Sequence, residues 1–310
     1  MPEVIMIIGP SGVGKTRWAG YWVAQGYIRL NRDTEQGKIL SLVHKMTACI
    51  RDGKSVVLDN TFLTAEKRQP FIEAAHELGA IVKCYIRETN QGDAQFNLCK
   101  RIVEAGVDIT DLNAIKVHPS PNIFPSSVHF RHWKEFQKPT EEEGFDEIIS
   151  MGFKRSPSPY NNKALILDYD GTLRRSLGPE NYPLKPSDVI LLPKRKEVLQ
   201  KYEEEGYFLL GASNQSAVGK GQLSYNDACD CFDKTNELLG LDIDYLFCPH
   251  KSGPINCWCR KPMPGIAVQF IEKYKLDMEQ TIMVGDQTSD VNFAQRAGIQ
   301  FRSAEEFFQN

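Results

Sequence analysis

An apolar run that ends in two aspartates constrains the fold of this chain more than any other stretch. Residues 164–167 read Ala-Leu-Ile-Leu, and Asp168 and Asp170 come directly after them. Such a run suits a strand of a parallel sheet that is covered on both faces. Ligands bind at the carboxyl ends of the strands in open α/β sheets. The sequence therefore predicts an α/β domain with reactive carboxylates at one edge of its sheet.

The length of 310 residues favours two domains. A polar, proline-spaced stretch without hydrophobic periodicity, residues 154–162, is typical of a linker. We expect a first domain over residues 1–155, a linker over 156–161 and a second domain over 162–310. Each is expected to be an α/β domain with a mainly parallel sheet flanked by helices.

The near balance of basic and acidic side chains limits how this chain could bind a nucleic acid. Residues 1–155 carry 20 basic and 19 acidic side chains, and residues 156–310 carry 17 and 21. A protein that grips a long duplex by its phosphates has a clear positive excess. A nucleic-acid substrate is therefore expected to be contacted at an end.

The N-terminal apolar run, residues 4–8, is too short to span a bilayer and has no basic start. We expect a first strand there, in a cytoplasmic protein without a membrane partner.

A glycine-rich loop follows that strand. Residues 9–16 read Gly-Pro-Ser-Gly-Val-Gly-Lys-Thr and precede an expected helix over 17–25, which is the setting of a phosphate-binding loop. Glycines let backbone N–H groups face the phosphates, the lysine reaches the β and γ oxygens, and the threonine offers its hydroxyl to Mg²⁺. The predicted ATP-binding residues are Gly9, Gly12, Gly14, Lys15 and Thr16.

Two aspartates at strand ends are candidates for acceptor chemistry. Asp33 follows the strand-like piece 27–30, where it could take a proton from an acceptor hydroxyl or cap a helix. Asp59 ends the apolar strand 55–58, where it could orient Mg²⁺, bind the acceptor, or cap the helix that begins near Ala65. The strand-end position favours function for Asp59.

Three stretches of the first half resemble the kinase domain of polynucleotide kinase/3′-phosphatases, namely residues 31–34, 57–61 and 136–148. The resemblance implies a P-loop kinase fold that uses ATP. It implies that Asp33 is the base for a 5′-hydroxyl and that Asp59 lies in the acceptor site.

The same resemblance makes Arg101 a lid arginine that contacts the phosphates, and a solvated helix charge is the alternative. Phage-type relatives carry an arginine where this chain has Gln36. That departure leaves one acceptor-phosphate contact unassigned, with Lys38 as the candidate.

Residues 107–135 contain prolines that break any long helix. His118, His129 and His132 have no metal-like spacing and are expected to be loop and surface residues. Trp133 is expected to pack with Phe136 on the core, and base stacking is the alternative.

The aspartate pair of the second half heads a set of four motifs. The set resembles that of haloacid-dehalogenase-type phosphatases and occurs in the family order, which implies a Rossmannoid fold. The motif residues are Asp168 and Asp170, then Ser213 and Asn214, then Arg260 and Lys261, and finally Asp286 and Asp290.

The resemblance also implies their roles. Asp168 attacks phosphorus and forms an aspartyl-phosphate, because an ionised carboxylate needs no activating base. Asp170 protonates the leaving alkoxide and then activates water. Ser213 and Lys261 bind the equatorial oxygens.

Mg²⁺ is expected between Asp168, Asp286 and the backbone carbonyl of Tyr169, with Asp290 as a further acidic group. Asn214 and Arg260 are expected to contact substrate.

Residues 248–259 gather three thiols and one imidazole. Cys248, His250, Cys257 and Cys259 suit a closed tetrahedral Zn²⁺ site, structural because no ligand position is left open, and free buried cysteines are the alternative. The arrangement resembles the zinc loop of histidinol-phosphate and heptose-bisphosphate phosphatases, which act on small phosphoesters.

These observations favour a bifunctional enzyme that heals nucleic-acid ends. The first half would phosphorylate 5′-hydroxyl ends and the second would hydrolyse 3′-phosphate ends, with functional coupling to a ligase. The main alternative is a kinase/phosphatase of sugar or amino-alcohol phosphates, favoured by the zinc loop. An ATP-dependent binding module is disfavoured because every expected nucleophile, base and metal ligand is present.

Overall fold

The protein forms two α/β units. The computed structural model describes residues 1–35 and 38–309. The units comprise residues 1–97 with 128–155, and residues 98–127 with 156–310. Each has a five-stranded sheet in which all strand pairs are parallel. The predicted fold class, two parallel-sheet domains flanked by helices, is confirmed.

The first sheet has the order β2-β3-β1-β4-β5. Its strands are β1 (Glu3–Ile8), β2 (Ile28–Leu30), β3 (Val56–Asp59), β4 (Ile81–Glu88) and β5 (Glu147–Gly152). The helices are α1 (Lys15–Ala24), α2 (Arg32–Glu35), α3 (Ser41–Arg51), α4 (Ala65–His76), α5 (Gln91–Glu104), α6 (Leu112–Val117) and α7 (Ser126–Glu135), with a 3₁₀ turn at Glu141–Glu143.

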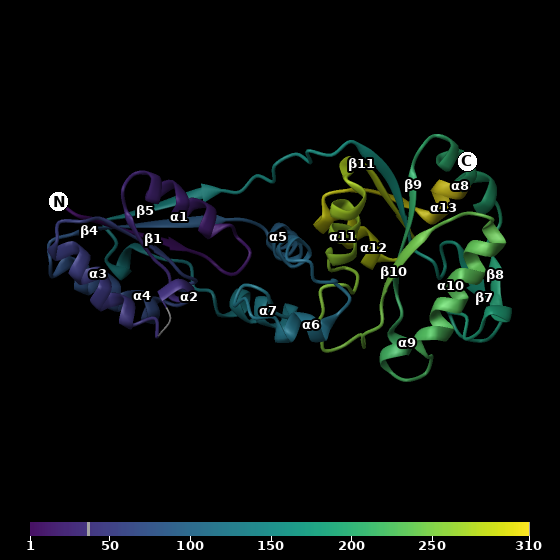
Figure 1. Ribbon diagram of the computed structural model, residues 1–310, viewed down its shortest axis with the longest axis horizontal. Helices are drawn as coiled ribbons and strands as arrows, with labels where there is room; N and C mark the ends of the chain where they lie inside the picture. Colours follow the sequence, from purple (N-terminus) through teal and green to yellow (C-terminus); the bar gives the residue numbers. More distant parts are fainter. Residues whose placement is uncertain (36–37, 310) are drawn as a thin grey trace. The chain divides into compact units, whose positions relative to one another are not determined.

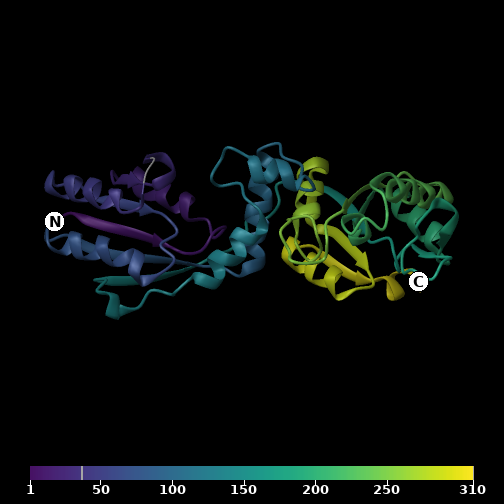
Figure 2. The ribbon, with the colours of Figure 1, turned by 90° about the horizontal axis from the view of Figure 1, so that it is seen from below.

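Alternation along β1 creates the two cores of this unit. Val4, Met6 and Ile8 pack with residues of α3 and α4, whereas Ile5 and Ile7 pack with α1. Successive side chains of a strand point to opposite faces. The sheet therefore lies between α1 and the α3/α4 pair, as Figures 1 and 2 show.

The second sheet has the order β10-β9-β6-β11-β12, so the predicted strand is its centre. Its strands are β6 (Asn162–Leu167), β9 (Phe208–Asn214), β10 (Asp244–Cys248), β11 (Leu276–Gly285) and β12 (Gln300–Ser303). A small antiparallel pair comprises β7 (Arg174–Ser176) and β8 (Val189–Leu191), with a 3₁₀ turn at Pro186–Asp188. The helices are α8 (Arg195–Glu204), α9 (Ser216–Gly219), α10 (Tyr225–Leu239), α11 (Gly265–Tyr274), α12 (Thr288–Ala297) and α13 (Ala304–Gln309).

Helices cover both faces of β6. Leu165 and Leu167 pack with residues of α8, α10 and α13. Ala164 and Ile166 are fully buried and point to the other face, and α11 lies against the neighbouring strands β9 and β11. This double coverage accounts for the uninterrupted apolar run of the sequence.

Residues 98–127 group with the second unit, whereas the sequence analysis placed them in the first domain. The backbone N–H of Ile109 donates to Gln269 Oε1 at 2.8 Å, and Trp258 Nε1 donates to the Phe124 carbonyl at 2.7 Å. The sequence shows that an apolar residue such as Ile109 is expected to be buried. It does not show which of the two hydrophobic cores the residue joins.

Membrane-spanning character is not found in the described residues: none of their helices has the length and apolar composition needed to cross a bilayer.

Arg68 of α4 holds the edge of the first unit together. Its guanidinium is fully buried and pairs with both carboxylate oxygens of Glu143 at 2.6 Å. It also donates to the carbonyls of Phe62 and Gln137 at 2.9 and 3.0 Å.

We predict that Arg68→Met destabilises this unit by about 3–5 kcal/mol, because it leaves the Glu143 carboxylate without its buried partner. Calorimetric unfolding measures the loss. The matched control is Lys67→Met, an exposed cation on the same helix, which is expected to stay within about 0.5 kcal/mol of the parent. Equal stability of the two variants would contradict the prediction.

Candidate active sites

The phosphate-binding loop lies between β1 and α1, as predicted. Gly12 and Gly14 have φ of 88° and 86°, a region that favours glycine. A Cβ on Gly12 would lie 2.4 Å from the carbonyl oxygen of Ala94, so α5 leaves no room for a side chain there. Lys15 Nζ donates to the carbonyls of Gly9 and Pro10 at 2.9 and 2.8 Å. The loop thus curls around the lysine at the start of α1, and Thr16 is exposed in the first turn.

Asp33 lies exposed in α2, beyond the carboxyl end of β2. Its own backbone N–H donates to Asn31 Oδ1 at 2.8 Å, so Asn31 caps this short helix and Asp33 does not. Its carboxylate is 3.4 Å from the exposed Arg32 guanidinium. Asp33 therefore presents a carboxylate that is accessible to solvent.

Asp59 lies buried at the end of β3, the strand between β2 and β1. The Arg29 guanidinium donates to one Asp59 carboxylate oxygen from Nη2 at 2.5 Å and from Nε at 3.1 Å. Thr64 is the N-cap of α4, so Asp59 does not cap that helix. Arg29 was missed by the sequence analysis, although a cation inside a short apolar strand is a signal of a buried acidic partner.

Two amides join the β2 and β3 ends. Asn31 Nδ2 donates to the Asp59 carbonyl, and the backbone N–H of Arg32 donates to Asn60 Oδ1 at 3.0 Å. Asn31 and Asn60 are both largely buried. These bonds fix the loops that carry Asp33 and Asp59 relative to each other.

The two predicted contacts of Arg101 and Lys38 stay predictions. Arg101 lies in α5 within the second unit, where Nη1 donates weakly to the Asn122 carbonyl at 3.4 Å. Gln36 lies outside the described residues. Lys38 is exposed, and its carbonyl accepts from Ser41 near the start of α3.

Lys261 joins two carboxylates of the second unit that are predicted site residues. Its Nζ is 2.6 Å from Asp168 Oδ1, 2.7 Å from Asp290 Oδ1 and 2.7 Å from the Ala212 carbonyl. The lysine is only 3% exposed. Burial disfavours its charge, but the Asp168 and Asp290 carboxylates outweigh this and raise the Lys261 pKa. The ammonium group is therefore present, and β6, β9 and α12 all meet at it.

The residues fit a divalent cation. Oxygens of Asp168, Asp286 and Asp290 lie within 4.8 Å of one another. Burial raises the pKa of the Asp168 carboxyl to about 7, and Lys261 opposes the rise. Three carboxylates with one ammonium leave a negative excess, and carboxylate oxygens are the ligands that Mg²⁺ prefers. A Cβ on Gly171 would lie 2.5 Å from Asp286 Oδ2, which explains the glycine after the aspartate pair.

The Tyr169 carbonyl, which was predicted to bind Mg²⁺, already has partners within the chain, and its metal contact stays a prediction. Its carbonyl accepts backbone hydrogen bonds from Leu173 and Arg174 at 2.9 and 3.0 Å, and so is used by the turn that follows β6. Its ring is fully buried, and its hydroxyl donates to Asn236. The backbone turn leaves this carbonyl engaged within the chain.

Both oxygens of Asp170 are held by residues that the sequence analysis missed. Arg174 Nε donates to Oδ1 at 2.8 Å, and Gln215 Nε2 donates to Oδ2 at 2.6 Å. Arg174 is 1% exposed, with its guanidinium 4.5 Å from the Phe232 ring centroid. Gln215 also donates to Ser213 Oγ at 3.1 Å. Asp170 is thereby fixed beside Ser213.

Ser213 and Asn214 lie at the end of β9, as predicted. Ser213 is 2% exposed. The Asn214 amide, expected to contact substrate, donates to the Lys261 carbonyl at 3.0 Å and accepts from the Lys261 N–H at 2.9 Å. It therefore positions Lys261. Arg260 precedes the lysine, and one of its terminal nitrogens is buried without a hydrogen-bond partner among the described residues.

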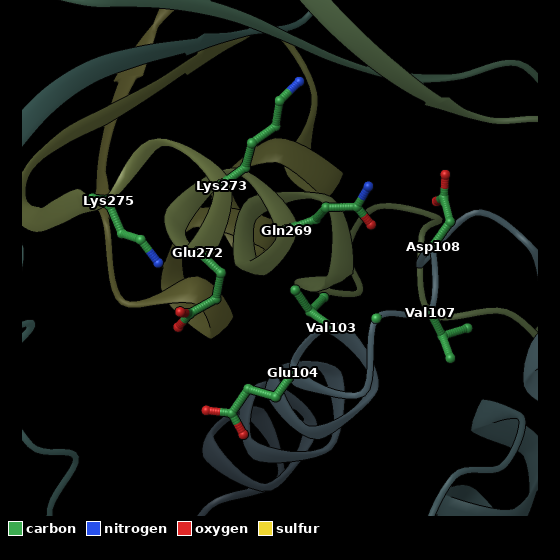
Figure 3. A pocket seen from close by; sticks show the side chains of 9 residues that line it. Val103, Glu104, Val107, Asp108, Gln269, Glu272, Lys273 and Lys275 are labelled. Carbon is green, nitrogen blue, oxygen red and sulfur yellow. The ribbon is translucent and has the colours of Figure 1, made fainter.

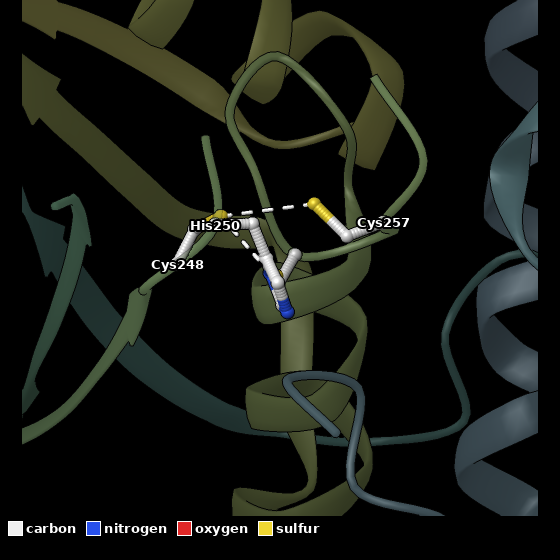
Figure 4. Close-up of side chains that lie close together, drawn as sticks. Cys248, His250 and Cys257 are labelled. Carbon is white, nitrogen blue, oxygen red and sulfur yellow. Dashed lines mark hydrogen bonds between the residues drawn. The ribbon is translucent and has the colours of Figure 1, made fainter. Parts of the chain in front are cut away.

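The four predicted zinc ligands gather at one point beyond β10. Cys248 Sγ is 3.7 Å from Cys257 Sγ and 3.5 Å from His250 Nδ1 (Figure 4). His250 Nδ1 is also 3.3 Å from Cys259 Sγ. Zn–S bonds of about 2.3 Å place two sulfurs of a tetrahedron about 3.8 Å apart. The side chains therefore fit a zinc ion, and all three thiols are buried.

A groove of about 550 Å³ lies elsewhere in this unit, between α11 and the end of α5 (Figure 3). Val103, Val107 and Gln269 line it together with charged side chains of both signs. None of the predicted site residues lines this groove.

Family models match both halves of the chain. Residues 4–112 match the AAA domain model, and residues 258–302 match the HAD-hydrolase-like model.

Two curated phosphatases match the second half. The probable D-glycero-D-manno-heptose-1,7-bisphosphate 7-phosphatase of Thermoplasma volcanium is 34% identical over 145 residues, which cover 45% of this chain and 97% of that protein. The D-glycero-alpha-D-manno-heptose-1,7-bisphosphate 7-phosphatase of Photorhabdus laumondii subsp. laumondii is 33% identical over 147 residues, covering 44% and 79%.

Solved structures with similarity include a D,D-heptose 1.7-bisphosphate phosphatase from B. bronchiseptica with magnesium and phosphate. It has 26% identity and a TM-score of 0.41, and the match covers 45% of this chain and 78% of that one. A chain of a Pnkp1/Rnl/Hen1 complex has 17% identity and a TM-score of 0.34, with coverage of 98% and 96%.

The sheet and its carboxylate cluster define the second unit as a haloacid-dehalogenase-type phosphatase. Through this unit the chain belongs to the same family as the heptose-bisphosphate 7-phosphatases. The predicted combination of a P-loop domain with such a phosphatase domain is confirmed. The chain is therefore an enzyme with two phosphate-handling sites.

We predict that Asp168→Asn lowers phosphatase activity on an aryl phosphate at least about 10³-fold, because the amide is not a nucleophile. Initial rates at saturating Mg²⁺ measure the effect. Asp230→Asn changes an exposed carboxylate of α10 in the same way and is expected to retain the parental rate. Parental activity in Asp168→Asn would exclude this residue as the nucleophile.

Proposed function

We propose that the chain heals broken nucleic-acid ends by phosphorylating 5′-hydroxyls from ATP and hydrolysing 3′-phosphates. The observation that carries the proposal is the presence of a P-loop domain and a phosphatase domain in one chain, in kinase-then-phosphatase order. Together the two reactions produce the 5′-phosphate and 3′-hydroxyl that a ligase joins. Coupling to a ligase and a cytoplasmic location are part of the proposal.

The kinase reaction uses adjacent strand ends of the first sheet. The strand order β2-β3-β1 brings Asp33, Asp59 and the phosphate-binding loop to one edge. Lys15 binds the β and γ phosphates of ATP, and Thr16 offers its hydroxyl to the nucleotide's Mg²⁺. Asp33 accepts the proton of the attacking 5′-hydroxyl. The Arg29–Asp59 pair, fixed through Asn31, shapes the acceptor side.

The phosphatase reaction runs through Asp168, whose carboxylate attacks phosphorus to form an aspartyl-phosphate. Asp170 gives a proton to the leaving alkoxide and then takes one from the attacking water, and Arg174 and Gln215 hold it in position. Lys261 neutralises Asp168 and Asp290. Asp168, Asp286 and Asp290 would hold a Mg²⁺ ion, which would supply the charge that offsets repulsion between carboxylate and phosphate.

The short segment between β6 and α8 supports the proposal that the phosphatase site accepts a large substrate. Only the β7–β8 pair and its turn separate β6 from α8, so no cap domain is inserted there. A strand end of a nucleic acid needs an open approach of this kind.

A second candidate is a kinase/phosphatase of small phosphoesters. The identity of 34% with a heptose-bisphosphate phosphatase favours it, because that relative is named for a sugar substrate. High turnover of sugar phosphates with no activity on oligonucleotides would establish it.

Oligonucleotide ends test the leading proposal. We predict ATP-dependent phosphate transfer to a 5′-hydroxyl oligonucleotide and phosphate release from a 3′-phosphate oligonucleotide, measured with DNA and RNA in parallel. Absence of both reactions would overturn it.

We predict that Asp33→Asn lowers the kinase rate about 10²–10⁴-fold, because the general base is lost, while phosphatase activity stays at the parental level. Single-turnover phosphate transfer measures the effect. Asp52→Asn removes an exposed carboxylate of the same unit and is expected to keep full activity.

The cysteine–histidine cluster is proposed to hold structural zinc. We predict that Cys257→Ser lowers bound zinc from about one ion per chain to near zero and lowers the melting temperature of the second unit. Elemental analysis and calorimetry measure both. Cys229→Ser, a half-buried thiol outside the cluster, is expected to retain the metal. Full zinc content in Cys257→Ser would contradict the site.

A further inference from the structure

Helix α7 reaches the phosphate-binding loop. His129, expected at the surface, is fully buried, and its Nδ1 lies 3.2 Å from Ser11 Oγ. Ser11 is the third residue of the loop and is 7% exposed. The two residues are 118 positions apart, so the contact is a tertiary one that local sequence cannot reveal. It belongs entirely to the first unit.

A second histidine of α7, His132, also lies near the lysine of the loop. His132 comes three residues after His129, and Trp133 comes four residues after it. This spacing places all three side chains on one side of the helix. The rings of His129 and Trp133 are 5.6 Å apart. Burial, together with the positive charges of Lys15 and Arg131, lowers the pKa of His132 to about 4. A neutral imidazole thus stands within the field of Lys15 and adds no charge to the phosphate site.

The loop needs such support. Gly12 and Gly14 have positive φ, and glycine loses more conformational freedom on ordering than any other residue. On another side, α5 fastens the loop: Asn97 Nδ2 donates to the Gly12 carbonyl at 2.8 Å. The Ser11–His129 hydrogen bond is a second fastening, made by a helix that follows α5 in the chain.

We propose that His129 is a positioning residue of the kinase: through Ser11 it holds the phosphate-binding loop in the conformation that receives the nucleotide phosphates. The inference rests on the proposed binding of a nucleoside triphosphate, and it is independent of the acceptor. His129 acts through Ser11 and does not touch the nucleotide. Loss of the pair makes ordering of the loop part of the cost of binding, so nucleotide affinity falls.

A double-mutant cycle on the full chain tests this coupling. The variants are Ser11→Ala, His129→Leu and the double variant, and the readout is the Kd for ATP with Mg²⁺ by calorimetry. We expect each single change to raise Kd about tenfold and the double change to be no worse than the weaker-binding single variant, because both remove one interaction. Kinase kcat at saturating ATP is expected to stay within about twofold, since chemistry is untouched.

Conservative and matched variants separate positioning from folding. His129→Asn places an amide where Nδ1 lies and is expected to restore most of the ATP affinity. His44→Leu, an exposed histidine of α3, is expected to leave Kd unchanged. Phosphatase activity on the same chain normalises the amount of active protein. If His129→Leu fails to fold, Ser11→Ala and His129→Asn carry the test.

Additive effects in the cycle, unchanged Kd in Ser11→Ala, or failure of His129→Asn to restore affinity would each overturn the proposal. The measurement needs no oligonucleotide. The double-mutant cycle could give the expected Kd values for ATP while the protein phosphorylates no nucleic-acid end. That result would refute the proposed function and leave this inference standing.

Discussion

The phosphatase site depends on the ion pairs that the buried Lys261 ammonium makes with Asp168 and Asp290. An ammonium group that is 3% exposed is tolerated because two carboxylates and a carbonyl surround it. These partners come from β6, from α12 and from β9, and Asn214 fixes the lysine backbone. Because Lys261 follows Cys259 by two residues, the cysteine–histidine cluster anchors the loop that delivers it. The charge of Lys261 thus links the sheet, helix α12 and the loop that carries the cysteine–histidine cluster.

Both units place their chemistry by the same topological rule. In each sheet all strand pairs are parallel, so every strand ends at the same edge. In the first unit that edge carries the phosphate loop, Asp33 and Asp59. In the second it carries Asp168 and Ser213. The aspartates of the two edges differ in exposure. Asp33 is open to solvent, whereas Asp168 is buried against a lysine. The exposed carboxylate suits the proposed base for an acceptor hydroxyl, and the buried one suits the proposed nucleophile for phosphorus.

Strand ends and short-range motifs could be predicted from the sequence, because apolar runs and glycine spacing are local signals. The phosphate loop, the carboxylate cluster and the cysteine–histidine cluster were found in this way. The partners of those residues could not. Arg174 and Gln215 on Asp170, and Arg29 on Asp59, depend on which strands become neighbours. His129 was misplaced for the same reason, since its partner lies 118 residues away.

Residues 98–127 give the chain an interlaced order, because the sequence passes from one unit to the other at 97/98, at 127/128 and at 155/156. No single scission therefore releases both units whole. A fragment that ends in the polar linker takes with it a segment that the phosphatase core uses, including Ile109 and Phe124. Any exchange of either half between proteins, in the laboratory or in evolution, would have to carry that segment along or rebuild its partner surface.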